Sequence, residues 1–251
     1  MLRNKIYLAA ACLTLLLCGC KEEKIFVFHG DPGINFLKYD TRNGWNEVLG
    51  NLYFDINFGT FITEWEQSEY TVYVQAKLEG MMSSEPMKIR LTYDFDPEKP
   101  HVEVLFRDDY ALMPNEYITE FEIVVKRPPV RDQLFGIPVK FDYANSDIVA
   151  GAEERQIFRL NVKDEFRFED AGISQDLWDN MIEPVLGMYS NTKLRFMAYA
   201  LQRRDLSHMA GGVTDRDRDA IRDKLAEYND AHPGNPLKDE NGDIVTFEPT
   251  I

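Results

Sequence analysis

The sequence predicts an α+β protein in which a β-rich segment precedes a helical one, and two observations support this. Between about residues 34 and 170 the chain carries short runs of alternating apolar and polar residues, rich in β-branched and aromatic side chains, with turn signals between them. From residue 171 onward, apolar residues recur at three- and four-residue steps, the period of an amphipathic helix. Because no helical pattern separates the strand candidates, we expect an antiparallel, immunoglobulin- or fibronectin-like β-sandwich followed by a helical region.

The first twenty residues form a distinct lead segment that contains all three cysteines of the chain. A short basic start precedes an apolar run from Ile6 to Cys18, which is too short to span a membrane as a helix. This pattern is typical of a secretory signal peptide. Its final residues, LCGC at 17–20, resemble a bacterial lipobox, in which the last cysteine is lipidated. We therefore interpret residues 1–19 as a lipoprotein signal peptide and Cys20 as the lipidation site, because an ordinary signal would leave an odd thiol in the exported chain.

Residues 20–33 are expected to form a lipidated tether. Several acyl chains together anchor a protein stably to a membrane. Lys21, Glu22 and Glu23 resemble the lysine-then-acidic tag that follows the lipidated cysteine in surface-exported lipoproteins of Bacteroidota. That resemblance implies a location on the outer membrane, facing the cell exterior. A solvated charged spacer explains the same residues, and both interpretations can hold together.

The expected β-sandwich spans residues 34–170. Its clearest strand candidate, Ile118–Lys126, places Phe121, Ile123 and Val125 on one face, as a half-buried strand requires. Turn-forming pairs rich in Pro, Asp, Asn and Ser separate the candidates. The strand candidates in chain order are Leu52–Phe58, Tyr70–Leu78, Met87–Tyr93, His101–Phe106, Ile118–Lys126, Gly136–Asp142 and Gln156–Val162.

Three helices are expected within residues 171–251. Ser174 and Thr214 are suitable N-caps, because their hydroxyl groups can accept hydrogen bonds from first-turn N–H groups. Ile221, Leu225 and Tyr228 would line the buried face of the third helix. The corresponding apolar stripes of the first two helices are Leu177, Trp178, Met181 and Ile182, and Leu194, Met197, Ala198 and Leu201.

Glycine and proline residues predict where the helices of this region end. Pro184 and Gly187 would interrupt the first helix, and the second would begin at about Asn191. Near the end of the chain, Asn241-Gly242 lies between two short extended runs. This pair favours a terminal hairpin with a type I′ turn.

Composition excludes some classes of function. The full chain has a formal net charge of −15, and it lacks the clustered basic residues that binding to nucleic-acid phosphates demands. Once the lead segment is removed and Cys20 is lipidated, no thiol remains for a disulfide or a cysteine-based zinc site. The acidity favours solubility on a crowded, anionic surface.

No motif for metal or nucleophilic chemistry is complete. The four histidines do not pair at the spacing of a zinc helix. DRDRD at 215–219 and DENGD at 239–243 lack the glycine that a calcium-binding loop needs at its sixth position, although a loose calcium site at the second remains a weaker alternative. No Gly-x-Ser-x-Gly elbow or phosphate loop occurs. We expect no metal, no cofactor and no enzymatic activity, with a hydrolase as the least favoured alternative.

Two tryptophans are candidates for contact with a ligand or partner. Trp45 lies in a polar stretch, and Trp65 lies between two glutamates, whereas Trp178 belongs to a helical stripe and should be core. Exposed aromatic rings can stack on sugars or anchor a partner protein. For each of Trp45 and Trp65, packing within its own domain is the stronger alternative.

The C-terminal half also carries a family resemblance. Residues 186–193, LGMYSNTK, resemble the LGxYSxxK signature of a Bacteroidota lipoprotein family of unknown function. Arg127-Pro128-Pro129 leading into GIPVKF, the later IFRLNVKDEF, and DPGINF at 31–36 are similar to other segments of that family. The resemblance covers most of the chain after the lead segment.

The resemblance implies a function without assigning catalytic residues. Members of such families are typically encoded beside SusC/SusD-like pairs, which are an outer-membrane transporter and its lipoprotein lid. It therefore implies an accessory surface lipoprotein of a nutrient-uptake complex that imports glycans or peptides. Its partners would be the SusC/SusD-like transporter and sibling lipoproteins. The alternative is a glycan- or peptide-binding surface module that uses exposed aromatic residues.

Overall fold

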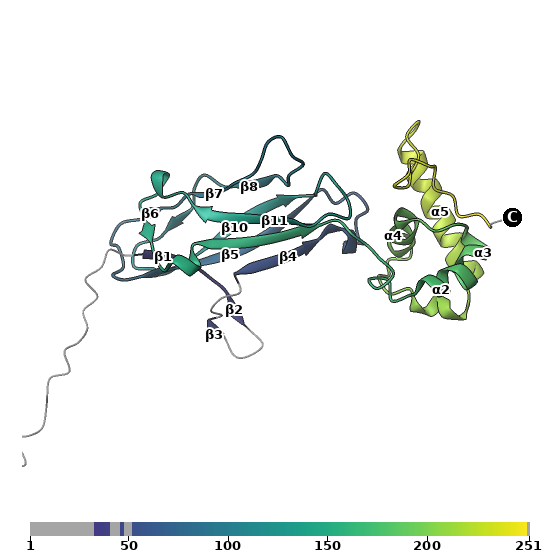
Figure 1. Cartoon of the computed structure of the whole chain (residues 1–251), viewed down its shortest axis with the longest axis horizontal. Coiled ribbons are helices and arrows are strands. Elements are labelled where there is room, and N and C mark those ends of the chain that lie inside the picture. The colour runs from purple at the N-terminus through teal and green to yellow at the C-terminus, as the bar shows by residue number, and fades with distance from the viewer. Residues whose placement is uncertain (1–32, 41–45, 48–51, 250–251) are drawn as a thin grey trace, which may run out of the picture.

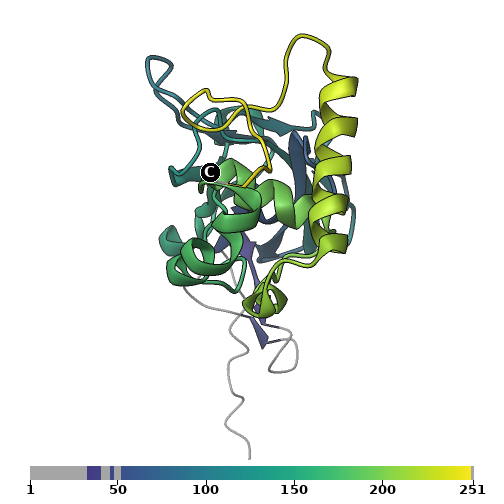
Figure 2. The ribbon, with the colours of Figure 1, turned by 90° about the vertical axis from the view of Figure 1, so that its right-hand side faces the viewer.

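The computed structural model describes residues 33–40, 46–47 and 52–249. These residues form a sandwich-like pair of β-sheets with a smaller helical region at one end, so the α+β class is confirmed (Figure 1). Figure 2 shows the molecule from its helical end. Among the described helices, none is both long and apolar enough to cross a membrane.

The first sheet has five strands in the order β12-β1-β5-β10-β8. The long strands β5 and β10 pair in antiparallel register along their length, with Phe121 opposite Val74. The strand β1 pairs antiparallel with β5 and parallel with the short β12. The bounds are β1 Gly33–Leu37, β5 Glu69–Glu79, β8 Val104–Phe106, β10 Ile118–Lys126 and β12 Val149–Ala150.

The second sheet has four strands in the order β4-β13-β11-β7. Its neighbours are antiparallel except β13 and β4, which run parallel. The bounds are β4 Tyr53–Asn57, β7 Leu91–Tyr93, β11 Phe135–Phe141 and β13 Ile157–Lys163. Two further two-stranded sheets join β2 (Tyr39–Asp40) to β3 (Asn46–Glu47), and β6 (Met87–Lys88) to β9 (Ala111–Leu112).

Two details of the predicted sandwich were wrong. The expectation of purely antiparallel strands fails at the β1–β12 and β4–β13 pairs, because each joins strands that are distant in the sequence. The predicted single strand Met87–Tyr93 is divided between two sheets. At the break, the Ile89 N–H donates to the Tyr110 carbonyl (2.9 Å), whereas the Arg90 N–H donates to the Ser146 hydroxyl (2.8 Å). Side-chain periodicity does not record this change of hydrogen-bonding partner.

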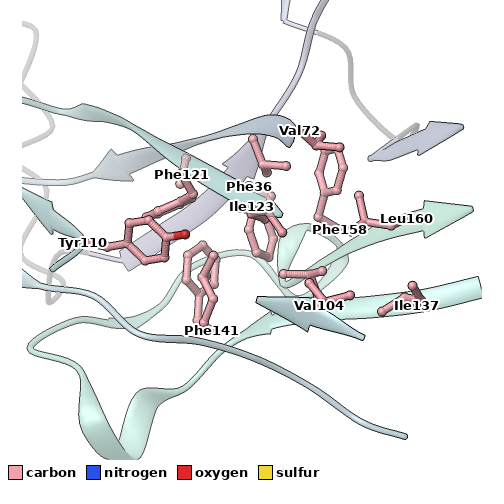
Figure 3. Close-up of a cluster of buried hydrophobic side chains, with 14 of the residues drawn as sticks. Phe36, Val72, Val104, Tyr110, Phe121, Ile123, Ile137, Phe141, Phe158 and Leu160 are labelled. Carbon is pink, nitrogen blue, oxygen red and sulfur yellow. The ribbon is translucent and has the colours of Figure 1, made fainter. Parts of the chain in front are cut away.

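Alternation of apolar residues builds the sandwich core (Figure 3). On β10, Phe121, Ile123 and Val125 are buried, as predicted. The ring of Phe141 stacks on that of Phe36 at a centroid distance of 4.1 Å, which joins β11 to β1 across the two sheets. Burial of such side chains contributes roughly 1.5–3 kcal/mol each, so this interleaved layer is the main source of sandwich stability.

The helical region follows the last strand of the sandwich. As predicted, Ser174 and Thr214 act as N-caps, since their hydroxyl oxygens accept the N–H groups of Leu177 and Asp217. The helical segments here are α2 Gln175–Leu177, η5 Trp178–Ile182, α3 Glu183–Leu186, α4 Asn191–Ala200, η6 Ser207–Gly211 and α5 Asp215–Ala231. Three short turns, η2 Phe58–Thr60, η3 Tyr143–Asn145 and η4 Glu153–Arg155, belong to the rest of the chain.

Pro184 shapes the first helix without ending it at once. Proline has no N–H to donate to the carbonyl four residues earlier, which here belongs to Asn180. The segment η5 around that carbonyl is a π-helix, and α3 continues from it to Leu186. A π-turn accommodates the missing bond. Gly187 then ends the helix with φ 86°, a conformation that suits glycine.

The terminal hairpin forms with a different turn from the predicted one. Lys238 pairs with Ile244, and the loop between them is longer than two residues. A type I′ turn needs positive φ at both central residues, but of Asn241 and Gly242 only Gly242 has it, at 89°. The Asp239 carboxylate stabilises the wider loop by accepting the N–H groups of Asn241 (2.9 Å) and Asp243 (3.0 Å).

This loop is fastened to the start of α4. The Glu240 carboxylate accepts the N–H groups of Asn191 (2.7 Å) and Thr192 (3.2 Å) and the Thr192 hydroxyl (3.1 Å). An acidic group at this position satisfies otherwise unpaired N–H groups and complements the helix dipole. The residues that follow the loop, Val245 and Phe247, are buried in the helical core.

Candidate functional site

The candidate site lies around Trp65, on the segment that joins β4 to β5. Trp65 is only 7% exposed and belongs to the helical core, although it precedes the helices by more than a hundred residues. Its ring meets those of Phe196 (5.1 Å), Tyr199 (5.7 Å) and Tyr228 (6.4 Å). For Trp65 the stronger of the two alternatives, packing within its own domain, therefore fits the structure, and an exposed stacking platform does not.

A pair of charged side chains from the sandwich, Arg127 and Asp164, lies next to Trp65. Arg127, directly after β10, makes a bidentate pair with Asp164, with Nε–Oδ2 2.8 Å and Nη2–Oδ1 3.0 Å. The same guanidinium donates to the Trp65 carbonyl at 3.3 Å. Because the Asp164 side chain is only 4% exposed, solvent screens this pair weakly. It ties both sandwich sheets to the segment that enters the helical core.

Arg195 of α4 contacts Trp65 from the helical region. Its guanidinium lies 4.5 Å from the Trp65 ring centroid and donates through Nη2 to the Trp65 carbonyl at 3.0 Å. Burial, together with the positive charges of Arg127 and Arg131, lowers the pKa of Arg195 to about 9. Its Nε has no partner among the described residues. The cation–π contact offsets part of the cost of burying this charge.

Two shallow pockets flank Trp65 at the surface. One has a volume of about 460 Å³ and the other about 400 Å³, and Trp65, Glu66 and Tyr228 border both. The first is also lined by Thr63, Glu64, Tyr199, Lys224, Glu227, Ala231 and His232. The second is also lined by Ser68, Arg127, Arg131, Asn235, Pro236, Leu237 and Lys238. These volumes lie within the range of small-ligand sites.

The polar groups of the first pocket are connected to one another. Glu66 Oε1 accepts the Tyr228 hydroxyl at 3.3 Å and lies 3.2 Å from His232 Nε2. The rings of Tyr228 and His232 stack at 4.2 Å. Burial and the Glu66 charge raise the pKa of the Tyr228 phenol. Aromatic surface beside carboxylate, phenol and imidazole groups can bind a polar ligand such as a sugar or a short peptide.

The LGxYSxxK motif forms a structural turn between α3 and α4. Ser190 is the N-cap of α4, with its hydroxyl accepting the Lys193 N–H at 3.1 Å. Lys193 folds back so that Nζ donates to the Leu186 carbonyl at 2.7 Å, which caps the preceding helix. Tyr189 packs on Phe168, with ring centroids 4.5 Å apart, and its hydroxyl donates to Asn191 Oδ1. Each motif position that we identified from the sequence thus has a role in this turn.

The other predicted site residues fall outside the described part of the chain. Cys20, Lys21, Glu22, Glu23 and Trp45 belong to residues for which the structure gives no description. Their proposed roles in lipidation, surface export and ligand or partner contact therefore stay predictions.

Several site residues were missed in the sequence. Arg195 lies outside the apolar stripe predicted for this helix, so nothing in the sequence pattern indicated that its side chain is buried. Glu66 and His232 lie far apart in the chain, and no local pattern links them.

The acidic clusters are accounted for by helix and turn contacts. Asp217 accepts the Thr214 hydroxyl at 2.8 Å, and Arg218 pairs with both Asp215 (2.9 Å) and Asp219 (3.2 Å). Within the described ranges, no group of three or more His, Cys, Asp or Glu residues is arranged to hold a metal ion.

Comparisons with known proteins gave weak structural similarities only. No family model matches the chain, and no curated protein matches it. Among solved structures, the apo-form Calx CBD1 domain shares 11% identity over 54% of this chain and 99% of that one, with a TM-score of 0.35. Bacteroides thetaiotamicron EndoBT-3987 with a Man5GlcNAc product shares 16% identity over 49% of this chain and 31% of that one, with a TM-score of 0.30.

We predict that Asp164→Asn lowers the free energy of unfolding by about 3 kcal/mol, because it leaves the partly buried Arg127 cation without its buried carboxylate partner. Urea unfolding monitored by tryptophan fluorescence measures the change. Glu122→Gln is the matched control, since Glu122 pairs with Arg107 at 3.4 Å on an exposed surface and its loss should change stability by less than about 1 kcal/mol. Equal effects of the two substitutions would contradict the assigned role of Asp164.

We predict that stability rises between pH 8 and 10 through Lys193. Burial lowers the pKa of Lys193 from 10.5 to about 8. Above pH 8 the folded state releases this proton while the unfolded state still binds it, so the unfolding free energy increases with pH, by up to about 2 kcal/mol. In Lys193→Met this rise should be lost, whereas the exposed Lys99→Met control should retain it. Urea titrations at several pH values test this, and identical profiles for wild type and Lys193→Met would refute it.

Proposed function

We propose that this chain is an accessory surface lipoprotein that docks through its helical region onto a SusC/SusD-like outer-membrane transporter and its sibling lipoproteins. The observation that supports this proposal is the position of the two ends of the sandwich. Strand β1 begins at Gly33, at the end opposite the helical region (Figure 1). A chain anchored through Cys20 would therefore hold its helical region away from the anchor.

The sequence features agree with this arrangement. The lipobox-like residues 17–20 supply a lipid anchor, and the acidic tag after Cys20 supplies a route to the outer face of the outer membrane. The proposed partners and nutrient, a glycan or a peptide, come from the family resemblance. On this proposal the chain acts by protein–protein contact and has no catalytic residue or cofactor, and its sandwich is of the immunoglobulin or fibronectin type.

The helical region offers apolar surface for docking. Met188 is 69% exposed on the turn between α3 and α4, and Met181 of η5 is 36% exposed. Exposed methionines adapt to different partner surfaces because the side chain is flexible and unbranched. They are the points at which we expect contact with a partner.

A second candidate function is capture of a glycan or peptide by the chain itself. The two pockets beside Trp65 favour it, because they combine ring edges with the connected polar groups of Glu66, Tyr228 and His232. The ligand would contact these groups at the pocket edges and not a free face of Trp65.

We predict that the epitope-tagged protein, isolated from detergent-solubilised membranes, recovers a large β-barrel partner. Met188→Asp should reduce this recovery, because it places a charge on the proposed contact surface. Leu105→Asp, at a 41% exposed position of β8 in the sandwich, is the control and should leave recovery unchanged. Quantitative mass spectrometry of the isolated material measures the ratio. Recovery of the lipoprotein alone from wild-type cells would count against docking.

We predict that calorimetry against a panel of oligosaccharides and short peptides finds a ligand whose affinity falls roughly tenfold or more in Glu66→Gln, because a hydrogen bond to a charged group contributes about 1.5–3 kcal/mol. Glu85→Gln, an exposed carboxylate at the other end of the sandwich, is the control and should bind as wild type does. Absence of heat with every member of the panel would remove the support for ligand capture.

A further inference from the structure

Two loops at one end of the sandwich expose a group of apolar side chains. The loop between β5 and β6 carries Met81 and Met82, which are 73% and 53% exposed, and the loop between β9 and β10 carries Met113 and Tyr117, both 53% exposed. We call these four residues the Met–Tyr cluster. Large apolar side chains gathered in this way usually mark an interaction surface.

The two loops are bound to each other, so the cluster is one surface. The Asn115 N–H donates to the Ser83 carbonyl at 2.9 Å. The Leu78 N–H, at the end of β5, donates to the Tyr117 carbonyl at 2.8 Å. Val149 of β12, 45% exposed, lies at the same end of the first sheet.

The Met–Tyr cluster lies where the described chain begins. Strand register places Gly33 opposite Glu79, the residue that leads into the first loop, and Ile118, which follows the second loop, opposite Lys77. Only thirteen peptide steps separate Cys20 from Gly33, and a chain of that length reaches at most about 45 Å. A lipid anchor at Cys20 therefore keeps this end, and not the helical end, close to the membrane.

The chemistry of the cluster suits the boundary between lipid head groups and acyl chains. Tyrosine is favoured there because its ring is apolar and its hydroxyl is polar, and methionine side chains conform to an irregular surface. Glu85 and Glu116 are exposed beside the cluster, and Glu79 is exposed there but pairs with Arg155 at 3.5 Å. The Glu85 and Glu116 carboxylates repel anionic lipids, so we expect the cluster to contact a lipid surface that is electrically neutral.

We propose that the Met–Tyr cluster contacts the lipid surface and sets the orientation of the anchored protein, with the sandwich standing on this end. The inference rests on the proposed anchor at Cys20. Apolar side chains at the loop tips bury additional area in the membrane beside the acyl chains of the anchor. The anchor and the loops together hold the protein in one orientation, whereas a tether alone permits many.

The test places a single fluorophore on the lipidated full-length protein. Because lipidated Cys20 leaves the mature chain without a free thiol, Met81→Cys can be labelled selectively with an environment-sensitive nitrobenzoxadiazole dye. Met188→Cys, 69% exposed at the helical end, is the matched control. Both proteins are reconstituted on phosphatidylcholine vesicles with and without nitroxide-labelled acyl chains, after thermal melts show that they unfold at the wild-type temperature.

We expect the dye at position 81 to shift to shorter wavelength and lose emission with the nitroxide lipids, and the dye at 188 to do neither. Adding phosphatidylglycerol should weaken the quenching at 81. No quenching at 81, or equal quenching at both positions, would overturn the membrane contact and leave the anchor intact. Labelling of the parent protein, which has no introduced cysteine, would instead reveal a free thiol at Cys20 or in an uncleaved lead segment, and either result would overturn the processed and lipidated anchor.

Discussion

The ion pair between partly buried Arg127 and buried Asp164 links the sandwich to the helical region. Arg127 directly follows β10 of the first sheet and Asp164 directly follows β13 of the second, so their bidentate contact joins the two sheets at one end of the sandwich. The same guanidinium binds the carbonyl of Trp65, whose ring belongs to the helical core. A charged pair out of water demands fixed geometry, because its hydrogen bonds must replace those of the solvent. The pair thereby fixes the entry of the helical region and the position of the pockets beside Trp65.

Much of the fold was predictable because its signals are local. Alternation on β10 gave the strand and its buried face, and the side chains of Ser174 and Thr214 gave two helix starts, since each feature depends on residues within one turn or one strand. The misses involve distant partners. The division of Met87–Tyr93 depends on bonds to Tyr110 and Ser146, which no local pattern encodes.

The candidate site was less predictable for the same reason. Trp65 was a candidate for ligand or partner contact, with packing in its own domain as the stronger alternative. The sequence did not indicate that Arg195 and Tyr228 from the helices would contact its ring. The pair formed by Glu66 and His232 joins residues from the two regions that are far apart in the sequence. In contrast, LGxYSxxK was recognisable because helix end, cap and lysine lie within eight consecutive residues.

The position of Phe247 has a consequence for the order in which the protein assembles. Its ring stacks on Phe196 at 5.9 Å, and Glu240 fastens the preceding loop to the start of α4. The chain is synthesised from its N-terminus, so every sandwich strand has been made once Lys163 has emerged. Phe247, which completes the helical core, is made some eighty residues later. Until Phe247 has been made, the apolar side chains of the helices that it covers stay exposed to solvent.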